Sequence, residues 1–183
     1  MSRSGRSVAQ PFEDAVARGF TLIELLIVVA IVGIVAAIAV PGLLRARISA
    51  DEASAVGSLR SLNSAQASYS SNAGGGFAAR LATLARGCSG SAPFLSLDLS
   101  TDPSIKSGYR VALQAGDDAV EGNDDCNGTP TYSAFYGTAV PVSAGVSGRR
   151  AFATLGAGIF FDDAGVAPTE DSMAAGGGAH ILR

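Results

Sequence analysis

One acidic residue, Glu24, lies within an otherwise uncharged apolar run that extends from Phe20 to Leu44. A carboxylate placed in hydrocarbon costs about 2.5–3.5 kcal/mol on insertion scales, so such a residue needs a partner. The run contains no cation, but cutting the peptide bond after Gly19 would create one, the free α-amine of Phe20. We therefore expect the Glu24 carboxylate to pair with this amine, most readily on a neighbouring copy of the chain.

A second group of candidate residues is an acidic, glycine-rich segment in the second half of the chain. Its carboxylates could supply the hard oxygen ligands that Ca²⁺ prefers, and the candidates are Asp117, Asp118, Asp124 and Asp125. Their spacing does not follow the EF-hand pattern. A solvated turn without metal is the simpler interpretation, so we expect no cofactor, with calcium as the alternative.

The chain has two cysteines, Cys88 and Cys126, and both follow the apolar run. Oxidising compartments outside the cytoplasm favour disulfide bonds. If this part of the chain lies outside the cytoplasm, we expect the two cysteines to pair. The alternative is two buried thiols.

No group of residues typical of catalysis occurs in the sequence. The only histidine, His180, has no cysteine near it with which to build a metal site. The sequence contains neither a Gly-x-Ser-x-Gly nucleophile turn nor a phosphate-binding P-loop. The formal net charge of −3 gives no reason to expect nucleic acid as an obligatory partner. We therefore expect a protein that is not an enzyme.

The apolar run is long enough to cross a membrane. It has 25 residues, whereas about 20 suffice for a helix to span a bilayer and a secretory signal has a shorter apolar region. Beyond it, apolar residues recur every three or four positions in 45–73, which predicts an amphipathic continuation of the same helix. Pro41 should loosen or kink the helix, and the glycines at 74–76 should end it.

The remainder, residues 74–183, predicts a globular head. A loop-like segment with Leu81, Leu84 and Leu95 precedes four runs of strand-like composition, at 108–114, 131–142, 150–155 and 158–161. Turn-forming residues separate these runs, as in hairpins. A helix followed by such strands predicts an α+β fold, in which a four-stranded antiparallel sheet packs on the second half of the helix. The tail from Gly176 onward is expected to be loose.

The junction Arg18-Gly19-Phe20-Thr21-Leu22-Ile23-Glu24-Leu25 resembles the processing site of type IV prepilins and type II secretion pseudopilins. The resemblance covers about residues 18–50. In that family a prepilin peptidase cuts after the glycine and methylates the new terminal amine. The resemblance thus implies a leader at 1–19, cleavage between Gly19 and Phe20, N-methylation of Phe20 and an assembly role for Glu24. It also implies a filament-core helix at 20–44 and a pilin-like head.

The implied function is that of a structural subunit of a type IV pilus-like filament. Its partners would be other copies of itself, the prepilin peptidase, the assembly machinery of the bacterial inner membrane and, before assembly, lipid. It would be a single-pass inner-membrane protein first and part of an extracellular filament later. A secretion pseudopilin is the first alternative, and a membrane-anchored enzyme or binding domain outside the cytoplasm is the second. The sequence does not distinguish motility, adhesion, DNA uptake, secretion or conduction.

Overall fold

The structure, a computed structural model, describes residues 19–88, 91–174 and 177–182. The predicted leader, residues 1–19, lies outside this part of the chain except for Gly19. The first element is one helix, α1 (Leu22–Asn72), which agrees closely with the helix predicted from the sequence. The chain divides between Pro41 and Gly42 into two compact units.

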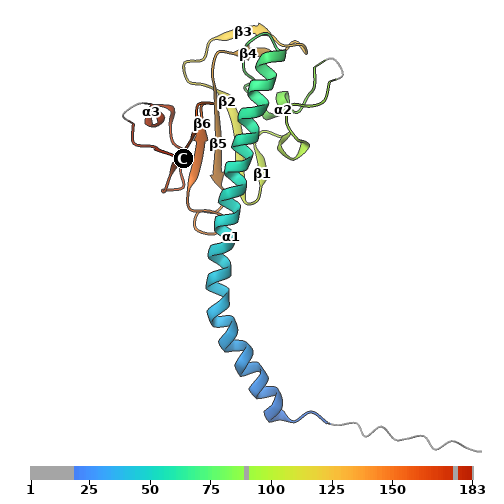
Figure 1. The fold of residues 1–183 in the computed structure, drawn as a ribbon, viewed down its shortest axis with the longest axis vertical. Coiled ribbons are helices and arrows are strands. Elements are labelled where there is room, and N and C mark those ends of the chain that lie inside the picture. The colour runs from blue at the N-terminus through green and yellow to red at the C-terminus, as the bar shows by residue number, and fades with distance from the viewer. Residues whose placement is uncertain (1–18, 89–90, 175–176, 183) are drawn as a thin grey trace, which may run out of the picture. The chain divides into compact units, whose positions relative to one another are not determined.

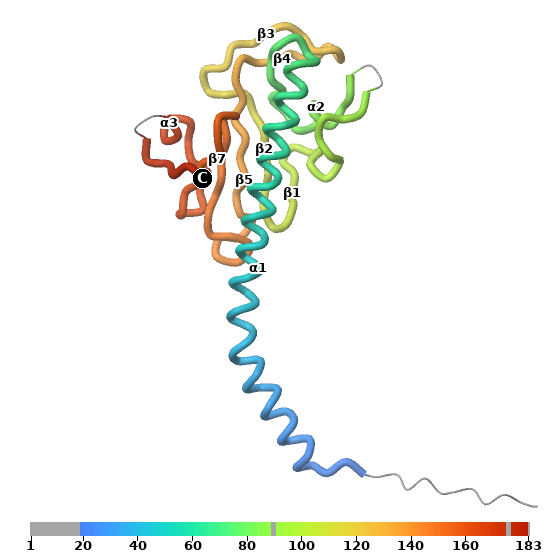
Figure 2. Tube along the Cα trace, in the orientation of Figure 1, coloured from blue at the N-terminus to red at the C-terminus, as the bar shows by residue number. Residues whose placement is uncertain are grey.

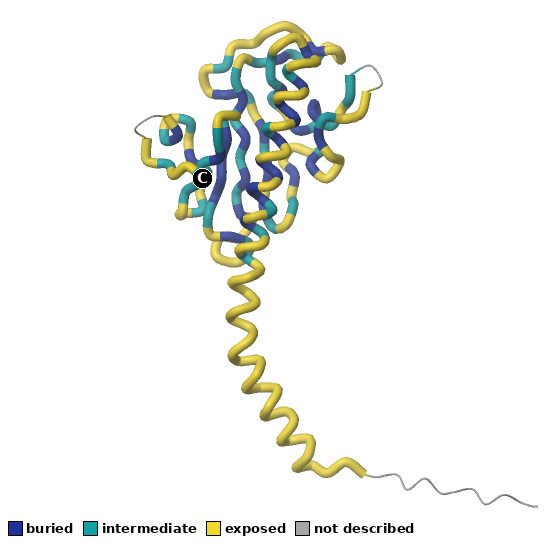
Figure 3. The backbone as a smooth tube through the Cα atoms, viewed as in Figure 1, coloured by how far each residue is buried: buried dark blue, intermediate teal, exposed yellow. Residues whose placement is uncertain are grey.

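The first unit contains the apolar start of α1. The large apolar side chains of this part of α1 are all exposed, by between 48% at Val28 and 82% at Leu22, and Figure 3 shows this stretch uniformly as exposed. Within the described residues, α1 is the one helix that is long and apolar enough to cross a membrane. Pro41 lies inside α1, and the kink expected there stays a prediction.

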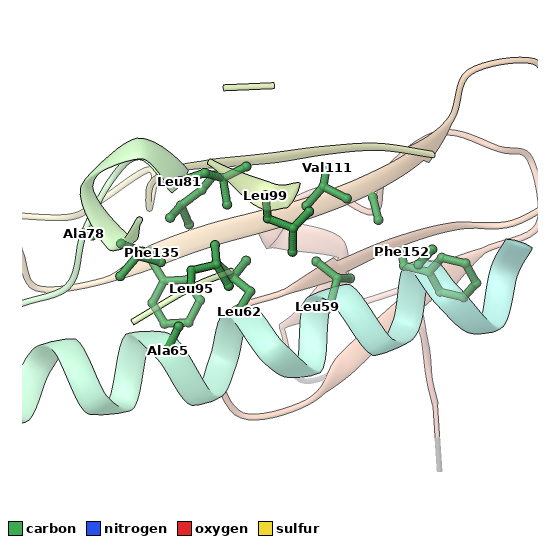
Figure 4. Packing of buried hydrophobic residues seen from close by; sticks show 14 of the residues in the cluster. Leu59, Leu62, Ala65, Ala78, Leu81, Leu95, Leu99, Val111, Phe135 and Phe152 are labelled. Carbon is green, nitrogen blue, oxygen red and sulfur yellow. The ribbon is translucent and has the colours of Figure 1, made fainter. Parts of the chain in front are cut away.

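In the second unit, α1 has a buried stripe facing the sheet. Positions three and four apart fall on one face of a helix, and these positions carry Ala55, Val56, Leu59, Leu62, Ala65 and Tyr69, all buried. Figure 4 shows Leu59, Leu62 and Ala65 facing Val111 and Phe135 of the sheet. Fully burying a leucine contributes about 1.5–3 kcal/mol, so this stripe accounts for much of the attachment of the helix to the head.

Within the described residues, the main sheet is antiparallel and has six strands in the order β1-β2-β5-β6-β7-β8. Their bounds are β1 Ser104–Lys106, β2 Tyr109–Ala115, β5 Phe135–Pro141, β6 Ala151–Thr154, β7 Ile159–Asp162 and β8 His180–Ile181. A second sheet pairs β3 (Glu121–Asp124) with β4 (Pro130–Tyr132). Figures 1 and 2 show α1 running alongside the central strands, with β3 and β4 beyond the end of the main sheet.

The α+β fold is confirmed, but the expected number of strands was too small. The segment 131–142 was predicted as one strand, whereas it divides into β4 and β5 between Tyr132 and Phe135. The expected loose tail includes β8, which pairs with β7 through Phe160 and Phe161. Strands β1, β3 and β8 have two to four residues each, too few for an alternating pattern to be recognisable.

The segment between α1 and β1, which was expected to be loop-like, covers one side of the core and includes two short helices. It contains helix α2 (Leu81–Leu84), the 3-10 helix η1 (Leu97–Leu99) and irregular loops between them. Leu81, Leu84 and Leu95 are all buried in the same cluster as the α1 stripe. A short helix, α3 (Glu170–Met173), lies between β7 and β8, and Thr169 caps it by accepting a hydrogen bond from the Ser172 N–H.

Candidate functional site

The N-terminal site is built around the first turn of α1. Thr21 immediately precedes the helix, and its hydroxyl oxygen accepts a hydrogen bond from the Glu24 N–H at 3.2 Å. The same hydroxyl donates to Glu24 Oε2 at 3.3 Å. A threonine before a helix and a glutamate three residues later form a capping-box sequence. Here the Thr21 oxygen satisfies one backbone donor of the first turn, the Glu24 N–H, while the Glu24 carboxylate accepts from the Thr21 hydroxyl.

Sequence reasoning assigned Glu24 an intermolecular role but missed this local one. The signal was present, because Thr-x-x-Glu ahead of an apolar run is typical of a helix start. The cap holds the carboxylate at the N-terminal end of the helix, where the helix dipole also favours a negative charge. One oxygen of Glu24, Oε2, contacts Thr21, so the carboxylate keeps capacity to accept a hydrogen bond from another group.

The other predicted processing residues lie next to this cap. Gly19 and Phe20 are both exposed and precede the helix, with Phe20 at 71% of its full accessibility. Cleavage between them and methylation of Phe20 stay predictions. The first turn of α1, where Thr21 holds the Glu24 carboxylate, is thus the start of a large apolar surface that nothing in the described chain covers. Such a surface needs lipid or protein to cover it.

A second carboxylate site connects α1 to the head and was not predicted. Glu52 is buried, and its Oε1 accepts hydrogen bonds from the N–H groups of Arg149 at 2.9 Å and Arg150 at 3.2 Å. Its Oε2 pairs with the Arg150 guanidinium. Burial raises the pKa of Glu52, but these hydrogen bonds and the nearby positive charge outweigh burial and hold the pKa below its usual value. The acid's place on the apolar stripe of α1, three residues before Ala55, was the available signal.

A third carboxylate, Asp125, fastens the end of α1. Its Oδ2 accepts a hydrogen bond from the Tyr69 hydroxyl at 2.9 Å. Its Oδ1 accepts from the N–H groups of Asn127 and Thr129, both at 2.8 Å. Burial raises the pKa of Asp125, but the backbone donors and Tyr69 outweigh burial, and the pKa is lowered. Burial and the bond to Asp125 strongly raise the pKa of Tyr69.

The two cysteines form a disulfide, Cys88–Cys126, as predicted, with their Cα atoms 5.6 Å apart. Cys126 directly follows Asp125. The bond therefore joins the segment after α2 to the turn that holds Tyr69. The disulfide and the hydrogen bonds of Asp125 both hold this turn. Two separate interactions therefore stabilise the region around the end of α1.

The four calcium candidates do not act as one group. Asp125 is buried and uses both carboxylate oxygens in the hydrogen bonds described above, whereas Asp117, Asp118 and Asp124 are exposed. In the described part of the chain, no three acidic, histidine or cysteine side chains are grouped so that they could hold a metal ion. Calcium binding, the alternative to the expected absence of a cofactor, has no support from this geometry, and the question stays untested.

A helix whose first half is apolar and exposed and whose second half packs on an antiparallel sheet defines a pilin-like protein. Residues 15–40 match the family described as the prokaryotic N-terminal methylation motif. The chain is also 36% identical over 100 residues to the type IV major pilin protein PilA of Myxococcus xanthus (strain DK1622). The resemblance to the type IV pilin family, predicted from the residues around Gly19, is thereby confirmed.

The aligned region covers 55% of this chain and 39% of the Myxococcus protein, so the chain spans about two fifths of the length of that relative. No solved structure matches the chain. The methylation motif and the pilin relative together indicate a structural protein rather than an enzyme. They also fit anchoring in a membrane by the apolar part of α1.

Proposed function

We propose that this chain is the structural subunit of a type IV pilus-like filament. A prepilin peptidase cleaves it after Gly19 and methylates Phe20, and copies then assemble through α1. The observation that carries the proposal is the exposed apolar surface of α1 from Leu22 to Leu44, most of which lies within the methylation motif matched at residues 15–40. Before assembly, lipid covers this surface; in the filament, the helices of other copies cover it.

The assembly mechanism follows from the chemistry of the first turn. Cleavage gives Phe20 a positively charged amine within one helical turn of Glu24. Pairing this amine with the Glu24 carboxylate of a neighbouring copy cancels two charges that are costly in an apolar bundle. Small residues on the same helix, Gly33, Ala36 and Ala37, permit close approach of helix backbones. The ion pair then fixes the axial register of one copy on the next.

Mass spectrometry of the mature N-terminus tests the processing step. We expect the protein isolated from its host to begin at Phe20 and to carry one methyl group on the amine. A protein that still begins at Met1 would contradict the proposal. It would favour the alternative of a membrane-anchored enzyme or binding domain outside the cytoplasm.

A type II secretion pseudopilin is the second candidate, because the methylation motif is common to both classes. The similarity to a major pilin favours the pilus. Electron microscopy of fibres sheared from the cell surface distinguishes the two. Abundant fibres composed of this chain support a pilus subunit, whereas a processed protein without surface fibres supports a pseudopilin.

A further inference from the structure

The connection between β5 and β6 carries two exposed valines, Val142 at 47% and Val146 at 73% exposure. A tight turn presents Val146 at its tip. Gly145 has φ +80, and its N–H donates to the Gly148 carbonyl at 2.7 Å. The Ser147 hydroxyl donates to the Ser143 carbonyl and closes the turn further. The exposed valine is therefore held in place by a well-bonded turn.

This turn is fastened beside α1, at the place where the apolar run ends. The Arg149 and Arg150 N–H groups that follow it bind Glu52 of α1. Val146 and Leu44 line the same hollow of about 230 Å³, together with Arg47. Figure 2 shows the β5–β6 connection at this end of the sheet, next to α1. Val146 thus lies level with the last residue of the apolar run.

Residue Leu44 also marks the expected edge of the membrane. At 1.5 Å per residue, the helix from Leu22 to Leu44 is about 34 Å long, close to the ~30 Å thickness of a bilayer's hydrocarbon core. A residue level with Leu44 would therefore lie at the boundary between hydrocarbon and headgroups. An exposed valine at a turn tip suits this depth.

Cationic side chains surround the same end of the head. Arg45 and Arg149 line a hollow of about 480 Å³ together with Ile48 and Ser49. Arg149 is exposed, and it is its backbone N–H, not its guanidinium, that binds Glu52. Of the acidic groups here, Glu52 is paired with Arg150, and Asp51 lies 4.0 Å from Arg47. Asp163 is the further acid in this hollow.

From this arrangement we propose that the membrane-proximal end of the head binds anionic phospholipid before assembly. Val146 enters the headgroup boundary, and the guanidinium groups of Arg45 and Arg149 contact lipid phosphates. Arginine suits this role because its planar guanidinium forms paired hydrogen bonds to phosphate oxygens. The contact orients the head on the bilayer while α1 is stored in it. This inference rests on the proposed function, since it requires α1 to lie in a membrane.

Tryptophan fluorescence provides a test, because the chain contains no tryptophan. The Val146→Trp variant of the full chain is reconstituted into vesicles of phosphatidylcholine with phosphatidylglycerol, or of phosphatidylcholine alone. Lipids brominated near the headgroup serve as quenchers. We expect blue-shifted, quenched emission in the anionic vesicles. The matched control is Val120→Trp, at an equally exposed residue (70%) near the opposite end of the sheet, which should stay unquenched.

Charge variants then test the arginines. Adding Arg45→Gln and Arg149→Gln to the Val146→Trp chain should reduce quenching about twofold in anionic vesicles, because surface cations draw the loop to the lipid. Adding Arg60→Gln and Arg80→Gln removes the same charge elsewhere and should have no effect. Emission like that of Val120→Trp would overturn the proposal. A blue shift without quenching by brominated lipid would also overturn it, because protein rather than lipid would then cover the introduced indole.

The proposal and the function on which it rests fail in different ways. If Val146→Trp is unquenched while the mature chain begins at Phe20 and forms fibres, the lipid contact alone is wrong. If the chain keeps its leader and forms no fibres, the filament function is wrong, whatever the vesicles show.

Discussion

The Glu52 carboxylate on α1 and the Arg150 guanidinium before β6 form a two-point ion pair, with Oε2 2.7 Å from Nη2 and 2.9 Å from Nε. The two residues are 98 positions apart in the chain. Because Oε1 also accepts the Arg149 and Arg150 N–H groups, one side chain of the helix holds a whole segment of the head.

Replacing Glu52 with Gln should destabilise the head. The change removes the charge and leaves Arg150 without its carboxylate, and hydrogen bonds to charged groups contribute about 1.5–3 kcal/mol. Since Arg150 is partly exposed, we expect a loss of about 1–3 kcal/mol. Urea denaturation of the full chain in detergent measures it. The neighbouring Asp51→Asn variant should lose less than about 0.5 kcal/mol, because its partner Arg47 is exposed. Equal losses would contradict this account.

Acid should weaken the head through Glu52 and Asp125. Both carboxyl groups have folded-state pKa values below their ordinary values of 4.5 and 3.8. A lowered pKa contributes stability that is present above the unfolded pKa and is lost as pH falls through the folded pKa. We therefore expect the melting temperature to drop below about pH 4.5. In a Glu52→Gln, Asp125→Asn variant the melting temperature should fall less at acid pH. If it falls as much as in the wild type, these two groups are not the source of the acid sensitivity.

The charge of Glu170 should destabilise the head near neutral pH, in contrast to the charges of Glu52 and Asp125. Burial raises its pKa, and the negative charges of Asp117, Asp118 and Asp171 raise it further, against the hydrogen bond from the Asp117 N–H. The stability that a raised pKa contributes is present at low pH and lost as pH rises through it. Glu170→Gln keeps an oxygen for the Asp117 N–H and removes the charge, so its melting temperature at pH 7 should equal or exceed that of the wild type. A clear decrease would show that the charge itself stabilises α3.

Removing the disulfide should cost more than removing any single hydrogen bond. The bond closes a loop with a sequence separation of 38, for which the chain-entropy model gives about 4 kcal/mol at 25 °C. We expect a Cys88→Ser, Cys126→Ser variant to lose about 2–4 kcal/mol in urea denaturation. Reduction of the wild type with dithiothreitol should give a similar loss, and a loss under about 1 kcal/mol would mean that Asp125 holds this turn without the bond.

The assembly role of Glu24 is tested by a variant that changes charge and little else. Glu24→Gln keeps a side-chain oxygen for the Thr21 hydroxyl, yet it leaves the Phe20 amine of a neighbouring copy uncompensated. Since a charge in hydrocarbon costs about 2.5–3.5 kcal/mol, fibre yield should fall by about tenfold or more. Membrane insertion and leader removal should be normal. Normal fibre yield, measured in the sheared fraction, would exclude the ion pair.

Most of the helix and four of the strand segments could be predicted from the sequence, because each has a local signal. The apolar run and the three-to-four-residue spacing of Leu59 and Leu62 indicate the two halves of α1, and alternation at Tyr109, Val111 and Leu113 indicates β2. Strands β1 and β8 have no such signal. Each is identified only by its pairing with the edge of a longer strand, β1 with β2 and β8 with β7.

The candidate site residues likewise divide into those that are close in sequence, which could be predicted, and those that pair over long sequence distances, which could not. The Gly19-Phe20 junction and Glu24 lie close together in the sequence, so a relationship between them could be predicted from the sequence alone. The clamp between Glu52 and Arg150 could not, since pairing across 98 positions depends on how the sheet is placed on the helix. The bonds of Asp125, one of the calcium candidates, could not be predicted for a similar reason. The residue before it, Asp124, is acidic and exposed, whereas the partner of Asp125, Tyr69, comes from the helix.

Two carboxylate contacts fix α1 to the head, Glu52 with Arg150 and Tyr69 with Asp125, and they lie near opposite ends of the packed half of α1. Glu52 and Tyr69 are separated by 17 residues, which is about 26 Å of helix. A tensile load applied along α1 therefore meets resistance at both ends of the head at once, with the apolar stripe between them loaded in shear. Sliding by one helical turn would break both contacts together. Helix and head should consequently bear tension as one mechanical element, and neither contact would fail long before the other.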